Sequence, residues 1–224
     1  MRIKGDNIKE NRKLIAGRLY KIWANRTIQF EEEETADIVN INFSIAENQY
    51  GIYGNEYKPP FIEDNGGKKA DILAFVIDEG KEKFSSWVLD VKKAVGGEDV
   101  IYHLIEQLTE SMKHKKSITT YLDDFVEEQH VGYITRDLQR DRIQETICKK
   151  STYLSKEQEN LECMPTLIKT QAQRKLLKEQ VKLGLLCDFQ NNCMKMGNDI
   201  IPLESYISQE KDGKFVYELN VASS

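Results

Sequence analysis

Two apolar runs decide the fold: ADILAFVI at residues 70–77 and, after a polar connector, WVLDVK at residues 87–92. Both runs have the length of a strand and are rich in Ile, Val, Phe and Trp, which favour strands. The connector begins with DEGKEK at residues 78–83, in which every residue except Gly80 is charged. This stretch therefore predicts a β-hairpin.

Each predicted strand carries an acid that its apolar neighbours do not explain, Asp71 in the first and Asp90 in the second. Strand side chains alternate between faces, so Asp90 and Lys92 share one face while Leu89 and Val91 point to the other. Two neighbouring carboxylates repel unless a divalent cation such as Mg²⁺ or Mn²⁺ neutralises both. A metal held there would activate a water and bind a phosphate oxygen, with Lys92 to hold the water or offset charge.

These residues resemble the motif of the PD-(D/E)xK nuclease superfamily, which has the restriction-endonuclease-like fold. Asp71 matches the first acid, Asp90 the second and Lys92 the lysine, with 18 residues between the acids. Ala70 stands in the place of the motif's proline, and Asp90 stands where glutamate is usual. The resemblance covers roughly residues 65–135 and implies that Asp71 and Asp90 bind Mg²⁺ or Mn²⁺ for catalysis with Lys92. The alternative is a surface pair of Asp and Lys, worth under about 1 kcal/mol.

The sequence after this hairpin predicts a helix from a cap at Asp99 to about Lys116, with apolar residues at helical spacing. In some members of the resembling superfamily a glutamine in this helix reaches the active site, which would give Gln107 a catalytic role. Ser111 stands where those members carry an aromatic residue. The alternative for Gln107 is an exposed helical side chain. Residues 130–135 then predict a strand, which completes the order strand, strand, helix, strand.

These elements and the resemblance imply an α/β (α+β) fold with a mixed central sheet flanked by helices. We expect a restriction-endonuclease-like core at residues 1–145 and a C-terminal extension of helices and strands at residues 146–224. The extension would pack on the core as one compact unit. A chain of 224 residues with 40% hydrophobic content buries one good core.

The composition favours a soluble, cytoplasmic protein without a membrane partner. The charged fraction is 31% and no stretch of 18 apolar residues occurs. The first residues lack the apolar segment of a signal peptide. The cysteines Cys148, Cys163, Cys187 and Cys193 form no C-x-x-C pair, so reduced thiols are expected.

The net charge of −5 and pI near 5.4 are unusual for a protein that binds a polyanion alone. Either the basic residues cluster on one face or a second subunit holds the nucleic acid. The candidates for phosphate contact are Lys93, Lys113, Lys115, Lys116, Arg174, Lys175 and Lys178. Positive charge at a helix C-terminus and ordinary surface packing are the structural alternatives.

Other segments carry less specific predictions. Residues 6–25 predict an amphipathic helix, and the acids at residues 31–34 predict the first turn of a second helix ending near Glu47. Glu10 and Glu47 both remain open as a further metal ligand. Residues 49–69 predict a long loop or short hairpin, with aromatic side chains for base stacking or for packing. Further predictions are helices at residues 138–162 and from Thr166 to a stop at Gly184, and strands at 185–189 and, on a sheet edge, at 214–221.

The function expected from these observations is metal-dependent hydrolysis of DNA phosphodiester bonds. By analogy with the superfamily, the chain would be the nuclease subunit of a restriction, repair or phage-defence system, beside a helicase or other ATPase. The alternative is a catalytically inactive subunit of nuclease-like fold that binds protein or nucleic acid.

Overall fold

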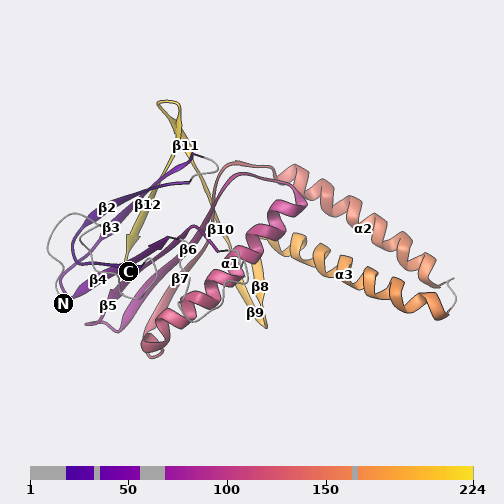
Figure 1. The fold of residues 1–224 in the computed structure, drawn as a ribbon, viewed down its shortest axis with the longest axis horizontal. Coiled ribbons are helices and arrows are strands. Elements are labelled where there is room, and N and C mark those ends of the chain that lie inside the picture. Colours follow the sequence, from indigo (N-terminus) through magenta and orange to yellow (C-terminus); the bar gives the residue numbers. More distant parts are fainter. Residues whose placement is uncertain (1–18, 33–35, 56–68, 163–165, 224) are drawn as a thin grey trace.

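The computed structural model describes residues 19–32, 36–55, 69–162 and 166–223, which form an α+β fold (Figure 1). The main sheet, sheet A, has the strand order β1-β4-β5-β6-β7-β10. Each of the first four strands in this order is antiparallel to its neighbours within that group, while β6, β7 and β10 run parallel. The strands are β1 (Leu19–Ile22), β4 (Gln49–Asn55), β5 (Ile72–Asp78), β6 (Lys83–Val95), β7 (Val126–Leu138) and β10 (Glu204–Ile207). The predicted fold class is therefore confirmed.

A second sheet, sheet B, covers one face of sheet A. Its order is β11-β12-β3-β2, where β12 pairs in parallel with β3. The strands are β2 (Arg26–Glu31), β3 (Ile38–Ser44), β11 (Gln209–Lys211) and β12 (Lys214–Ala222). Apolar side chains from alternate positions of both sheets meet between them, including Ile41 of sheet B and Leu89 of sheet A. This alternation explains why neighbouring residues of β5 and β6 serve different cores.

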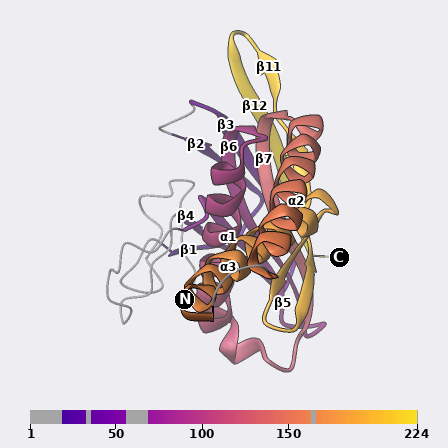
Figure 2. The ribbon, with the colours of Figure 1, turned by 90° about the vertical axis from the view of Figure 1, so that its right-hand side faces the viewer.

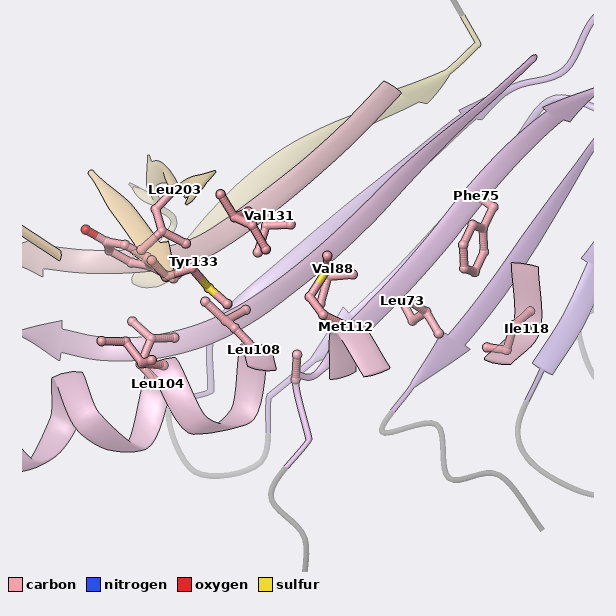
Figure 3. Packing of buried hydrophobic residues seen from close by; sticks show 14 of the residues in the cluster. Leu73, Phe75, Val88, Leu104, Leu108, Met112, Ile118, Val131, Tyr133 and Leu203 are labelled. Atoms are coloured by element: carbon pink, nitrogen blue, oxygen red, sulfur yellow. The ribbon is translucent and has the colours of Figure 1, made fainter. Parts of the chain in front are cut away.

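The helix α1 (Glu98–Thr119) covers the other face of sheet A and continues into a short 3₁₀ turn, η2 (Thr120–Leu122). Figure 3 shows Leu104 and Leu108 of α1 pointing toward sheet residues Val131 and Tyr133. All four side chains belong to a single buried cluster. Three layers result, with helix, sheet A and sheet B in that order, and β5 and β6 lie in the middle layer.

Gly132 in β7 allows the last strand of sheet A to approach. A Cβ atom at this position would lie 2.0 Å from the backbone oxygen of Glu204, the residue that pairs with it. No side chain fits in that space, so β10 can lie beside β7 only because position 132 is a glycine.

Two long helices, α2 (Arg140–Glu162) and α3 (Thr166–Gln190), form a hairpin that extends away from both sheets (Figure 1). They run side by side in both ribbon views (Figure 2). Near the middle of α2, the ammonium of Lys150 bridges Glu98 of α1 and Glu179 of α3, with 2.8 Å to Glu179. The small hairpin of β8 (Cys193–Met196) and β9 (Asp199–Pro202) follows α3.

The predictions for the middle of the chain are confirmed. The hairpin at residues 70–92 exists as β5 and β6, whose paired residues include Ile72 with Leu89. The predicted order strand, strand, helix, strand is realised by β5, β6, α1 and β7. The helix predicted at residues 138–162 is α2. Asp99 is not the cap of α1, however, because the N-cap is Gly97 and Asp99 lies in the first turn.

The helix predictions near the N-terminus are wrong where they can be compared. Residues 19–22 and 26–31 are β1 and β2, and the second predicted helix is replaced by β3 and a turn. The strands form because Ile28 and Phe30 of β2 and Ile41 and Phe43 of β3 alternate toward sheet A, and this burial outweighs local helix propensity. The part of the first helix at residues 6–18 and most of the loop at 56–68 lie outside the described residues, while Gln49–Asn55 is a strand.

The C-terminal predictions need three corrections. Gly184 does not stop α3, which continues to Gln190. The strand predicted at residues 185–189 is therefore the last part of that helix, where Leu186 and Phe189 are buried in the helix-side core. The strand at residues 214–221 exists as β12, but it lies between β11 and β3 and not on an edge. None of the helices in the described parts of the chain has the length and apolar character needed to cross a bilayer.

Candidate active site

Asp71 and Asp90 lie opposite each other on neighbouring strands. The pairing of Ile72 with Leu89 in the antiparallel ladder, continued by one residue, places position 71 beside position 90. By strand alternation their side chains share the face of Leu73 and Val88, which belong to the helix-side core. The predicted juxtaposition of the two acids therefore follows from the register of the hairpin.

Asp71 forms a hydrogen bond with β6, the strand that carries the other acid. Its Oδ2 accepts a hydrogen bond from the backbone N–H of Val91, at 2.7 Å. β5 begins only at Ile72, so the carboxylate takes the place of the next backbone acceptor in the ladder. This bond aligns Asp71 with the segment between Asp90 and Lys92.

Asp90 is completely buried and pairs with the lysine two residues along the strand. The Lys92 Nζ lies 2.5 Å from Asp90 Oδ2, and the Lys92 side chain is 20% exposed whereas that of Asp90 is 0% exposed. Both carboxylate oxygens of Asp90 are nevertheless buried without a hydrogen bond of good geometry among the described residues. A buried carboxylate in this condition has unused lone pairs.

Both acids are harder to ionise than ordinary aspartates. Burial, followed by the charge of Asp90, raises the pKa of Asp71 to about 8. Burial also raises the pKa of Asp90, to about 6, although the nearby Lys92 opposes that shift. A proton on Asp71 shared with an ionised Asp90 is the arrangement that these opposing effects favour.

The helix α1 holds the start of β5 in place through two polar side chains. Gln107 Nε2 donates a hydrogen bond to the backbone oxygen of Lys69 at 3.0 Å, and Ser111 Oγ accepts one from the N–H of Ala70 at 2.7 Å. Gln107 is 9% exposed, and its Oε1 is buried without a hydrogen-bond partner in the described chain. The alternative of an exposed side chain for Gln107 is therefore wrong, and Gln107 and Ser111 together contact the residues just before Asp71.

The negative charge of Glu32 also raises the pKa of Asp90. Glu32 follows β2 directly, and the sequence interpretation missed it because the run of four acids suggested a solvated helix start. Glu47 lies elsewhere, in the turn between β3 and β4, where it lines a different cavity. That turn is at the far end of β4 and β5, so Glu47 is not a further ligand at this site. Glu10 lies outside the described residues.

The chemistry of the acid pair fits a small divalent cation. Asp71 and Asp90 supply carboxylate oxygens, the ligands that Mg²⁺ and Mn²⁺ prefer. Within the described ranges no group of three or more His, Cys, Asp or Glu side chains could hold a metal ion. Mg²⁺ commonly retains several waters beside one or two carboxylates.

The basic residues predicted to contact phosphate do not form one group. Lys93 is exposed on β6, and Lys113 and Lys116 are exposed on α1, where Lys113 pairs with Glu110 at 2.5 Å. Lys115 is 4% exposed and contacts Glu127 and Gln129 at 2.5 Å each, so its ammonium is turned into the protein. Arg174, Lys175 and Lys178 are exposed on α3, in the protruding hairpin.

Comparison with known proteins found no matching family model, no matching curated protein and no matching solved structure.

Proposed function

We propose that this chain is a metal-dependent phosphodiesterase that cleaves DNA. The observation that supports the proposal most directly is the placement of Asp71, Asp90 and Lys92. One buried acid lies just before β5 and the other lies opposite it on β6, and a lysine stands two residues further along the same face of β6. This is the arrangement expected for a PD-(D/E)xK-type site.

In this proposal Asp71 and Asp90 hold Mg²⁺ or Mn²⁺. The bound metal would lower the pKa of a water and polarise a phosphate oxygen. Asp71 loses its proton when the site is loaded, since a raised pKa means that the cation must displace that proton. Lys92, with its side chain partly exposed beside Asp90, holds the attacking water or offsets the negative charge of the transition state. Gln107 and Ser111 position the backbone from which Asp71 projects.

The wider role included in the proposal is that of a cytoplasmic nuclease subunit in restriction, repair or phage defence, working beside a helicase or other ATPase. Among the described residues, Cys148, Cys187 and Cys193 are free, which suits a reducing compartment. The dispersed basic residues support a partner that supplies part of the grip on DNA, because phosphate contacts dominate affinity.

A second candidate, a catalytically inactive subunit that binds protein or nucleic acid, is favoured by one observation. The acids already have partners inside the protein: Val91 N–H for Asp71 and the Lys92 ammonium for Asp90. Such a pair would hold the β5–β6 hairpin together without a metal. The two candidates differ in whether divalent cations bind.

The test is incubation of the purified chain with plasmid and linear DNA in Mg²⁺, Mn²⁺ or chelator, with and without a candidate ATPase partner. The proposal expects divalent-dependent cleavage that an Asp90→Asn variant lacks. Calorimetric titration with Mn²⁺ should show binding in the parent and a large loss in that variant. Absence of both cleavage and metal binding in the folded parent would favour the inactive subunit.

A further inference from the structure

A second feature lies at the opposite end of β5 and β6, around Trp23 and Tyr50. The turn between β5 and β6 contains Glu79 and Gly80, whereas Asp71 precedes the start of β5. The seven residues of β5 separate the two places by about 23 Å at the usual strand rise. Anything bound here is therefore independent of the proposed metal site.

Two aromatic rings meet at this end of sheet A. The ring centroids of Trp23 and Tyr50 are 5.5 Å apart and the ring planes are inclined by 42°. The pairing of Ile22 with Gly51 in β1 and β4 places residues 23 and 50 opposite each other when it is continued by one position. The two inclined rings thus border a shared space, and the pairing of β1 with β4 fixes their relative position.

A positive charge already occupies that angle. The Lys21 Nζ lies 3.5 Å from the ring centroid of Tyr50 and 4.2 Å from that of Trp23. Both distances are well within the range for attraction between a cation and the negative face of a ring. The contact of an ammonium group with both rings shows that the space between them accommodates a cation.

An open cavity of about 740 Å³ adjoins the rings. It is lined by Trp23, Tyr50, the β3–β4 turn and the β5–β6 turn, and it carries the carboxylates of Glu47 and Glu79. Both acids are exposed. The lining therefore combines aromatic faces with negative charge, which suits a cation and disfavours a phosphate.

Lys21 is not an ideal occupant of the space between the two rings. Burial lowers the pKa of Lys21, although the charge of Glu79 partly compensates. Lys21 is thus held where its charge is less well solvated than in water.

We propose that Trp23, Tyr50, Glu47 and Glu79 form a binding site for a small organic cation of the alkylammonium or guanidinium class, whose place is taken in this structure by the ammonium of Lys21. The ligand's charged head enters the angle between the two rings, and the carboxylates balance its charge at the mouth. Lys21 moves out when the ligand binds. The side chain acts as a plug that the ligand must displace.

The direct test compares choline with its neutral isostere 3,3-dimethylbutan-1-ol, by calorimetry and tryptophan fluorescence, on the parent and on Lys21→Met. Removing the plug should increase choline affinity by about tenfold or more, while Tyr50→Leu or Glu79→Gln in the same background should lower it. Lys81→Met is the control, because Lys81 lies with Glu79 in the β5–β6 turn but pairs with Asp78. Arginine amide in place of choline tests the guanidinium head.

A second measurement uses the parent chain and does not depend on how Lys21→Met folds. Saturating choline should expose Lys21 and increase its acetylation by an amine-reactive reagent, read by mass spectrometry, whereas the neutral isostere should not. Equal binding of choline and the isostere would show an apolar cavity and overturn the proposal. Failure of choline both to bind folded Lys21→Met and to change Lys21 acetylation would overturn it as well.

Discussion

Asp71 accepts a hydrogen bond from the backbone N–H of Val91, the residue that lies between Asp90 and Lys92. The position of one acid of the candidate site is therefore determined by the strand that carries the other acid and the lysine. A carboxylate fixed in this way cannot move away from Asp90 to relieve their repulsion. The strain of two buried acids remains in the folded protein until a proton or a cation neutralises it.

The first prediction concerns Asp90→Asn, which removes a buried charge and keeps the shape of the side chain. Divalent-dependent DNA cleavage should disappear, because the cation loses a charged ligand. Stability of the metal-free protein in urea should be unchanged or higher, because the buried carboxylate and its repulsion with Asp71 are gone. Asp99→Asn, an exposed acid in the first turn of α1, is the control and should cleave as the parent does. Cleavage by Asp90→Asn at the parental rate would contradict the assignment of Asp90 as a metal ligand.

The second prediction concerns Lys92→Ala. Cleavage should fall by about 100-fold or more, the usual cost of removing a group that stabilises charge in a transition state. The affinity for Mn²⁺, measured by calorimetry, should stay near the parental value, because Lys92 is not a ligand. Lys83→Ala, at the exposed beginning of the same strand, provides the control. If Lys92→Ala abolished metal binding too, a structural role in holding Asp90 would be the better account.

The third prediction follows from the raised pKa values of Asp71 and Asp90, about 8 and about 6. An aspartate in the unfolded chain has a pKa of about 3.9, so between about pH 4 and pH 8 the folded state binds more protons than the unfolded state. The free energy of unfolding of the metal-free protein should therefore fall as pH rises through this window. Each group contributes a slope of at most about 1.4 kcal/mol per pH unit.

Urea denaturation in chelator at a series of pH values would measure this slope. Asp71→Asn should flatten the dependence between about pH 6 and pH 8, where only Asp71 still titrates toward its folded pKa. An identical pH dependence in parent and variant would show that Asp71 is not protonated at neutral pH.

The sequence predicted the centre of this fold because local and tertiary signals agree there. Residues 70–92 combine strand propensity, period-two alternation and a polar connector, and the observed register follows. The relation between Asp71 and Asp90 could be predicted for the same reason. In contrast, residues 26–31 and 38–44 form strands because sheet B packs on sheet A, a contact between segments distant in the chain. No local pattern contains that information.

The structural role of the α1 polar residues was equally inaccessible from spacing alone. Gln107 and Ser111 lie four residues apart on one helix face, but their partners are backbone atoms of Lys69 and Ala70. A sequence motif identifies side chains but does not say which backbone atoms those side chains bind. Gly184 illustrates the opposite error, because a glycine in a helix interior costs only about 1 kcal/mol and the packing of Leu186 and Phe189 carries α3 onward.

The fourth prediction concerns Lys150 of α2, which forms ion pairs with Glu98 of α1 and Glu179 of α3. Lys150→Met removes one partner each from Glu98 and Glu179, whose side chains are 30% and 23% exposed. Glu98 keeps the Tyr102 hydroxyl and Glu179 keeps Lys182, so the cost in the free energy of unfolding should be about 1 kcal/mol. Lys149→Met is a matched control, because the neighbouring lysine forms an exposed pair with Glu145 and should have little effect. Equal effects of both substitutions would show that the bridge does not anchor the hairpin.

The last prediction concerns the need for a partner on DNA. Of the basic residues predicted to contact phosphate, Lys115 is buried against Glu127 and Lys113 pairs with Glu110. Arg174, Lys175 and Lys178 lie on the protruding helix α3. A net charge of −5 adds general repulsion. Few simultaneous phosphate contacts follow, and each contributes about 0.9 to the slope of log affinity against log salt.

The isolated chain should therefore bind DNA weakly at about 0.15 M salt, with a slope of only a few, and it should cleave poorly. If the proposed helicase or other ATPase partner supplies the missing contacts, its addition should increase both binding and cleavage. Replacing Arg174, Lys175 and Lys178 by Gln together tests whether α3 belongs to the DNA surface, and Lys149→Gln on α2 is the control. Loss of salt sensitivity in the triple variant would assign α3 to DNA. Tight, salt-resistant binding with vigorous cleavage by the parent chain alone would refute the requirement for a partner.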